Sequence, residues 1–224
     1  MSIKIYPDLH HIDEEYIQLI KDSGAQITSI GIQTTNPEAL KKINRPTLQH
    51  LDRQIQMVLQ EFSEVPADLI IGLPGDNIKG LEKSFQDVLS LGFISVNIFR
   101  LMVFPGTILS ENFPDYFQPE ETVLSPQGQL IYSPEFNIRD QQKLSNYIYA
   151  LEIICWILRT RKIPLTISER LDIFINMVTR LNYDQLIDLF NDISTVQYSS
   201  QNPRADRILE NIIRIFAENG IQIG

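Results

Sequence analysis

Short apolar runs and amphipathic stretches alternate along the first half of this chain. Runs typical of strands occupy positions 2–6, 26–33, 67–73 and 93–104, and the third, "ADLIIGL", suits a parallel strand covered on both faces. Between these runs, residues 13–24, 37–43, 47–62 and 78–92 have the spacing of helices with one apolar side. The order β-α-β-αα-β-α-β predicts parallel strands joined by right-handed crossovers.

Helix boundaries are marked by residues that suit helix ends. Asn36 followed by Pro37 is expected to begin a helix, because Asn caps the free N–H groups and Pro fits the first helical position. Gly24 and Gly92 follow two of the amphipathic stretches, where Gly is the expected residue past a helix C-terminus.

The pattern changes after residue 104. Prolines interrupt it between residues 105 and 137, which predicts a long and mostly irregular connection. Helical periodicity then returns in residues 139–162, 166–181, 182–195 and 203–220. We therefore predict an α/β fold: parallel strands in residues 1–109 that form either a small open sheet or a piece of a barrel, a Pro-rich connection in 110–137, and an all-α helical domain in 138–224.

Composition narrows the possible function classes. The 224 residues carry a formal net charge of −9, which argues against a broad nucleic-acid interface because phosphate binding favours a basic surface. No apolar run reaches the roughly 20 residues of a membrane span, and no secretory signal opens the sequence. We expect a cytoplasmic protein without nucleic-acid or membrane partners.

Metal-ligating residues are sparse. Cys155 is the only cysteine and lies in the apolar run "LEIICWIL", which predicts a buried, unreactive thiol and excludes a cysteine-rich metal site. The adjacent His10 and His11 point in different directions on a regular element, so metal binding there is the less favoured interpretation. We predict no metal ligated by this chain.

Polar residues near the ends of predicted strands are the best candidates for a site. Ligands gather at the C-terminal ends of parallel strands, where Gln33 lies, and Arg45 follows the next short helix. Asp68 lies near the start of the third run and is either a local cap or an acceptor for a ligand. The glycines of "GLPGD" offer backbone N–H groups to an anion, although most such turns bind nothing. The residues alone give no reaction.

Three segments taken together resemble the radical S-adenosylmethionine superfamily. "IGIQTTNPEALKKINRP" resembles its fifth barrel strand and the following helix, and "ADLIIGLPGD" resembles its sixth strand. "NIFRLMVFPGTIL" resembles the next strand in the branch that carries a cobalamin-binding domain. "IYPDLHHIDEEYIQLIKDSG" fits the fourth strand and its helix, so the resemblance covers residues 2–109.

The resemblance implies roles for four residues. In oxygen-independent coproporphyrinogen oxidases, the matching glutamine, arginine and aspartate contact S-adenosylmethionine. Carried over, Gln33 and Arg45 hold the polar parts of the cofactor, and Asp68 accepts from its ribose hydroxyls. Ile70 flanks the adenine. The residue types agree with these roles, because a carboxylate accepts two hydroxyl hydrogens and arginine suits a carboxylate.

Departures from the superfamily pattern limit what the chain does alone. The three cysteines that hold a four-iron four-sulfur cluster are missing, as is the glycine-rich segment that grips the methionine amino group. Lys4 and Ser29 stand where the superfamily often has acids. The resemblance implies that residues 1–109 form a partial (β/α) barrel half, which a missing N-terminal half or a partner chain completes. It also implies that the cluster, and the cobalamin of the cobalamin-binding branch, belong only to the complete enzyme.

Three functions remain open at this stage. In the first, the chain is part of a radical S-adenosylmethionine enzyme, contributes residues of the cofactor pocket and a substrate-side helical domain, and is not catalytic alone. In the second, it is a non-catalytic partner subunit built on a barrel half. The third alternative is an unrelated α/β enzyme that uses Asp68 and the "GLPG" turn for a phosphate-bearing substrate.

Overall fold

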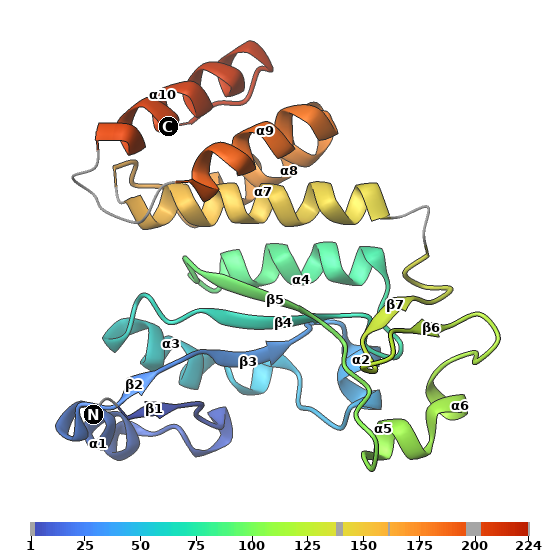
Figure 1. Cartoon of the computed structure of the whole chain (residues 1–224). Coiled ribbons are helices and arrows are strands. Elements are labelled where there is room, and N and C mark those ends of the chain that lie inside the picture. Colours follow the sequence, from blue (N-terminus) through green and yellow to red (C-terminus); the bar gives the residue numbers. More distant parts are fainter. Residues whose placement is uncertain (1–2, 138–140, 161, 196–202, 224) are drawn as a thin grey trace.

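The computed structural model describes residues 3–137, 141–160, 162–195 and 203–223. Parallel strands with covering helices form the first half of the chain, and helices form the end of it (Figure 1). This confirms the predicted α/β fold class, a partial barrel followed by helices. The strands of the first half are β1 (Lys4–Ile5), β2 (Gln26–Ile27), β3 (Ile30–Gln33), β4 (Ala67–Ile71) and β5 (Val96–Arg100).

The helices follow the predicted order with shifted boundaries. Residues 47–62, predicted as one helix, divide into a short 3₁₀ turn and a helix that begins at Asp52. The helices of the first half are α1 (Glu14–Ser23), α2 (Pro37–Lys42), α3 (Asp52–Glu61) and α4 (Ile78–Ser90), with 3₁₀ turns η1 (Leu9–His11) and η2 (Leu48–His50). Those of the C-terminal part are α7 (Gln141–Thr160), α8 (Ile167–Arg180), α9 (Tyr183–Ser194) and α10 (Pro203–Glu218). Residues 139–140 and 161 of the first predicted C-terminal helix lie outside the described residues.

The sheet places three strand positions side by side. Strands β3, β4 and β5 pair in parallel, in that order, and Gly31, Asp68 and Asn97 are register partners. The run 26–33, predicted as one strand, divides into β2 and β3. The Thr28 N–H donates to the Ile5 carbonyl of β1, whereas the Ile30 N–H donates to the Pro66 carbonyl before β4. The run therefore bridges β1 and β4.

The two faces of β4 have different surroundings. Ala67, Leu69 and Ile71 are buried in the main hydrophobic cluster, which includes residues of α3, α4 and α7–α10. Because side chains alternate along a strand, Asp68 and Ile70 point to the opposite face. Helices thus cover one face of the sheet, and the polar candidates lie on the other.

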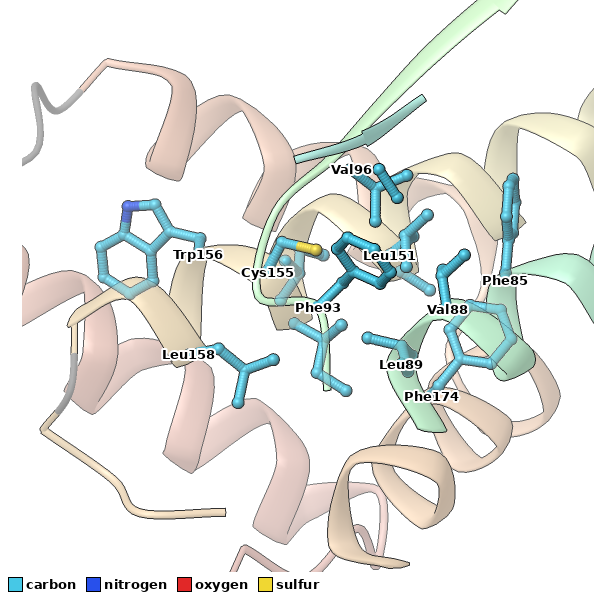
Figure 2. Packing of buried hydrophobic residues seen from close by; sticks show 14 of the residues in the cluster. Phe85, Val88, Leu89, Phe93, Val96, Leu151, Cys155, Trp156, Leu158 and Phe174 are labelled. Carbon is cyan, nitrogen blue, oxygen red and sulfur yellow. The ribbon is translucent and has the colours of Figure 1, made fainter. Parts of the chain in front are cut away.

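The C-terminal helices share the main cluster with the sheet. Figure 2 shows Phe85 and Leu89 of α4 gathered near Phe174 of α8, with Cys155 of α7 beside Phe93. The Phe85 and Phe174 rings meet edge to face, with centroids 6.3 Å apart. One continuous apolar cluster therefore joins the two halves, and the predicted domain boundaries remain a prediction.

The connection after β5 is more regular than its prolines indicated. It contains α5 (Ile108–Glu111), α6 (Phe113–Tyr116) and an antiparallel hairpin of β6 (Val123–Leu124) and β7 (Leu130–Tyr132). Phe117 and Leu130 pack in a second hydrophobic cluster with Leu101 and Val103. The connection therefore covers part of the open face of the sheet (Figure 1).

Candidate functional site

A cavity of about 470 Å³ opens beside β3 and brings three of the candidate residues together. Gln33, Arg45 and Asp68 all line it, although 35 positions separate the first from the last in sequence (68 − 33). The other lining residues come from the segment after β1, from β3 and the residue before it, from α2, and from the stretch that follows α2 as far as the end of η2: Tyr6, Pro7, Asp8, Leu9, His10, Ser29, Gly31, Ile32, Leu40, Asn44, Pro46, Leu48 and Leu51.

Asp68 is held by donors on both sides. The Ser29 hydroxyl donates to Asp68 Oδ2 at 2.5 Å, and the Asn97 amide donates to Oδ1 at 2.8 Å. A carboxylate has about four lone-pair sites, so each oxygen keeps capacity for another donor. This carboxylate is therefore oriented and still able to accept hydrogen bonds from a ligand.

Gln33 ends β3 in an unusual backbone conformation. Its φ is 68°, and the Thr34 N–H donates to the Ile32 carbonyl at 2.9 Å. An i→i+2 hydrogen bond around a residue of positive φ is typical of the rare, strained γ-turn. Strained residues of this kind concentrate at functional sites, where the surrounding structure holds them in place.

The absence of a side chain at Gly31 makes room for the candidate polar groups. A Cβ built on Gly31 would lie 2.7 Å from Gln33 Nε2 and 4.0 Å from Arg45 Nη1. Both side chains therefore reach over the backbone of β3 at the position next to Asp68. Gln33, Arg45 and Asp68 are thus gathered in one cavity, where a single ligand could contact all three polar groups.

Arg45 is aimed by the end of α2. Asn44 has φ 53°, the Asn44 N–H donates to the Lys41 carbonyl, and the Arg45 N–H donates to the Leu40 carbonyl at 2.8 Å. These bonds form a Schellman motif with Asn44 as the left-handed residue. The Arg45 side chain is exposed and forms no ion pair within the described part of the chain, so its charge is available to an anionic ligand group.

A buried polar cluster supports the turn between β3 and α2. The Asp76 carboxylate, 1% exposed, accepts from the Thr34 hydroxyl at 2.9 Å, the Asn36 amide at 3.0 Å and the Asn77 N–H at 2.8 Å. A Cβ at Gly80 would collide with Asp76 Oδ1, so this first turn of α4 accepts only glycine without rearrangement. Asp76 thereby links the strained Gln33 turn to the start of α4.

Burial makes the charge on Asp76 costly. Desolvation raises the pKa of Asp76 from its ordinary value of 3.8, and hydrogen bonds from Asn36, Asn77 and Thr34 lower it in part. Asp76 thus keeps its proton to a higher pH in the folded state than in the unfolded state. The contribution of Asp76 to the free energy of unfolding therefore falls as the pH rises from the unfolded-state pKa to the folded-state pKa. We expect the Asp76→Asn variant, which does not titrate, to become more stable relative to the wild type as the pH rises above the ordinary Asp76 pKa of 3.8.

Chemical denaturation of both proteins at each pH measures this difference. Other titrating groups are common to both proteins and cancel in the comparison. A stability difference that stays constant or moves in the opposite direction would show that burial does not dominate the pKa of Asp76.

Ile70 and the "GLPG" turn do not line the cavity, whereas His10 does. Ile70 is partly buried against the second hydrophobic cluster and is not among the cavity-lining residues, so its predicted adenine contact stays a prediction. Leu130 fills the space where a Cβ of Gly72 would lie, which leaves the "GLPG" turn covered on that side. His10 lines the cavity and is exposed.

Iron–sulfur ligation does not fit the described residues. They contain no group of three or more His, Cys, Asp or Glu side chains able to hold a metal ion. Cys155 is buried, and its pKa is raised to about 12, chiefly by desolvation.

Among the described helices, none is both long and apolar enough to cross a membrane.

Two residues that donate hydrogen bonds to Asp68 were not predicted from the sequence. Ser29 stands out there only as a departure from the superfamily pattern, and Asn97 is assigned no role. Polar residues at both positions inside strand-forming runs were the available signal, because a polar group facing apolar surroundings needs a partner.

Curated relatives match part of this chain. The chain is 29% identical over 133 residues to the heme chaperone HemW of Bacillus subtilis, covering 57% of this chain and 33% of that protein. It is 28% identical over 99 residues to HemW of Lactococcus lactis, covering 43% of this chain and 26% of that protein. This chain is homologous to part of HemW.

The homology supports the resemblance of this chain to the radical S-adenosylmethionine superfamily, to which HemW belongs. It gives no support to the cobalamin-binding branch. The matched segment spans about a third of the Bacillus protein, and no family model matches the chain.

Proposed function

We propose that this chain contributes the ribose- and carboxylate-binding part of an S-adenosylmethionine pocket in a HemW-like protein. One observation carries the proposal: Gln33, Arg45 and Asp68, which the superfamily resemblance assigned to this cofactor, line one cavity. Its volume of about 470 Å³ lies within the usual range of small-molecule sites.

The residue types divide the cofactor between them. Asp68 accepts from the ribose hydroxyls, and Arg45 binds the methionine carboxylate through its guanidinium. The Gln33 amide lies over Gly31, as the Arg45 guanidinium does, and offers both a donor and an acceptor. S-adenosylmethionine supplies an activated sulfonium group when it is bound. This chain orients that molecule and keeps its polar groups paired.

The cluster and the rest of the barrel are proposed to come from residues outside those described here, in an N-terminal half or a partner chain. β1 is the edge strand of its sheet among the described residues, with Ile3 56% and Tyr6 71% exposed beside it. Unpaired edges favour pairing with further strands. Heme handling, which the relatives' name states, is proposed for the complete protein only, and cobalamin remains a prediction of the sequence.

Calorimetric titration of the chain with S-adenosylmethionine tests the proposal. We expect weak binding by the wild type, because the cluster anchor is missing, and about tenfold weaker binding by Arg45→Ala, since a charge-assisted bond contributes roughly 1.5–3 kcal/mol. Arg207→Ala is the matched control, because Arg207 is also exposed but lies on α10. It should bind as the wild type does.

The rival functions predict other outcomes. No heat with S-adenosylmethionine would overturn the pocket and favour a non-catalytic partner subunit. Binding of a phosphate ester without S-adenosylmethionine binding would favour the unrelated α/β enzyme. Equal loss in Arg45→Ala and Arg207→Ala would show that the cavity is not the binding site.

A further inference from the structure

Among the described contacts, Asp68 alone of the three candidate polar residues accepts hydrogen bonds from side chains on two different strand segments. Ser29, 2% exposed, reaches it from the segment before β3, and Asn97 reaches it from β5. The two donors bind different carboxylate oxygens. A carboxylate bonded on both oxygens does not rotate freely about its final torsion, so its free lone pairs keep a fixed direction.

We propose that Ser29 and Asn97 are positioning residues that fix Asp68 as a reader of a cis-diol, so that the cavity selects ribonucleosides over nucleosides without the 2′- and 3′-hydroxyls. This inference rests on the proposed S-adenosylmethionine site. It adds two positioning residues, Ser29 and Asn97, to which the superfamily resemblance assigns no role.

The number of acceptor sites matches a diol. Each Asp68 oxygen uses one lone pair on a protein donor and keeps another, which provides one acceptor for each of two neighbouring hydroxyls. A site built to bind hydroxyl groups rejects analogues that lack them, because its polar atoms are then left unpaired. The geometry thus favours discrimination as well as affinity.

The identity of the two donors preserves the charge of the acceptor. A serine hydroxyl and an asparagine amide are neutral, so they orient Asp68 without cancelling its negative charge. A charged acceptor forms stronger hydrogen bonds than a neutral one. Arg45 lies on the Gly31 side of the cavity and forms no ion pair with Asp68 in the structure.

Asn97 separates positioning from direct contact. Ser29 lines the cavity and is able to touch a ligand, whereas Asn97 is not among the lining residues. An effect of Asn97→Ala on ligand choice must therefore act through Asp68. Asn97→Ala and Ser29→Ala remove the two donors in turn, and Ser29→Thr keeps a hydroxyl at the first position.

The test compares adenosine with 2′,3′-dideoxyadenosine, titrated into the full chain and each variant. We expect the wild type to bind adenosine at least about tenfold more tightly, which corresponds to roughly one charged hydrogen bond or more. In Asn97→Ala and Ser29→Ala the ratio should fall to about two- to threefold through weaker adenosine binding alone. Ser29→Thr should restore most of it.

The outcomes distinguish this inference from the proposed function. Equal binding of both nucleosides by the wild type, or equal weakening of both in the variants, overturns the diol reader, since a merely structural role would affect both ligands. If S-adenosylmethionine binds in either case, the proposed pocket survives. If neither S-adenosylmethionine nor adenosine binds the folded wild type, the pocket itself is wrong.

Discussion

Replacing Phe174 with alanine is expected to lower the free energy of unfolding of this protein by about 3–5 kcal/mol, the usual cost of removing a buried aromatic ring. Phe174 is 0% exposed on α8 and contacts Phe85 of α4 and Tyr147 of α7, with ring centroids 6.3 and 6.4 Å away. The ring therefore lies where the C-terminal helices meet the helix that covers the sheet. Its loss should weaken both parts in one cooperative transition.

Ile175→Ala is the matched control for this variant. Ile175 is the next residue of α8, also large and apolar, but 42% exposed. Its truncation should cost less than about 1 kcal/mol, because less apolar surface returns to water. Denaturant unfolding measures both variants. A small loss in Phe174→Ala, or two separate transitions in the wild type, would contradict a shared core.

Replacing Asp76 with alanine is expected to cost about 2–4 kcal/mol of stability, because it leaves several buried donors without an acceptor. The Thr34 hydroxyl, the Asn36 amide and the Asn77 N–H all donate to this carboxylate. Since Thr34 follows the strained Gln33, we also expect weaker binding of S-adenosylmethionine.

Two further variants serve as comparisons for Asp76→Ala. Asp76→Asn keeps a carbonyl oxygen for two of the donors and should lose less stability than Asp76→Ala. Asp172→Ala removes an exposed aspartate of α8 and should stay within about 0.5 kcal/mol of the wild type. Thermal unfolding at pH 7 measures all three variants. If Asp76→Ala proves as stable as Asp172→Ala, the polar cluster does not support the turn.

Local signals predicted the elements well. Asn36 accepts from the Glu38 N–H and begins α2, and Gly24 is left-handed at the end of α1, as their residue types indicated. Thr166 and Glu169 form a capping box at the start of α8. Caps depend on contacts within a few residues, which a sequence displays directly.

Elements that depend on distant contacts were predicted less well. The hairpin of β6 and β7 was not predicted, because it depends on a distant contact. Leu130 of β7 packs against Gly72, which is far away in sequence. The division of residues 26–33 into β2 and β3 likewise depends on pairing with β1 and with the segment before β4. Neither partner is visible in the local pattern.

The same distinction holds for the site. The sequence by itself determined that Gln33, Arg45 and Asp68 were candidates. Gln33 lies at a strand end, where ligands of parallel sheets gather, and Arg45 follows the next short helix. Asp68 is a charged residue beside an apolar run, where it needs a partner. Only the tertiary structure decided that Ser29 and Asn97 hold Asp68, that Gly31 leaves room for the two polar side chains, and that Ile70 packs elsewhere. The reason is register: residue alternation fixes which face a side chain takes, but pairing between strands fixes which side chains become neighbours.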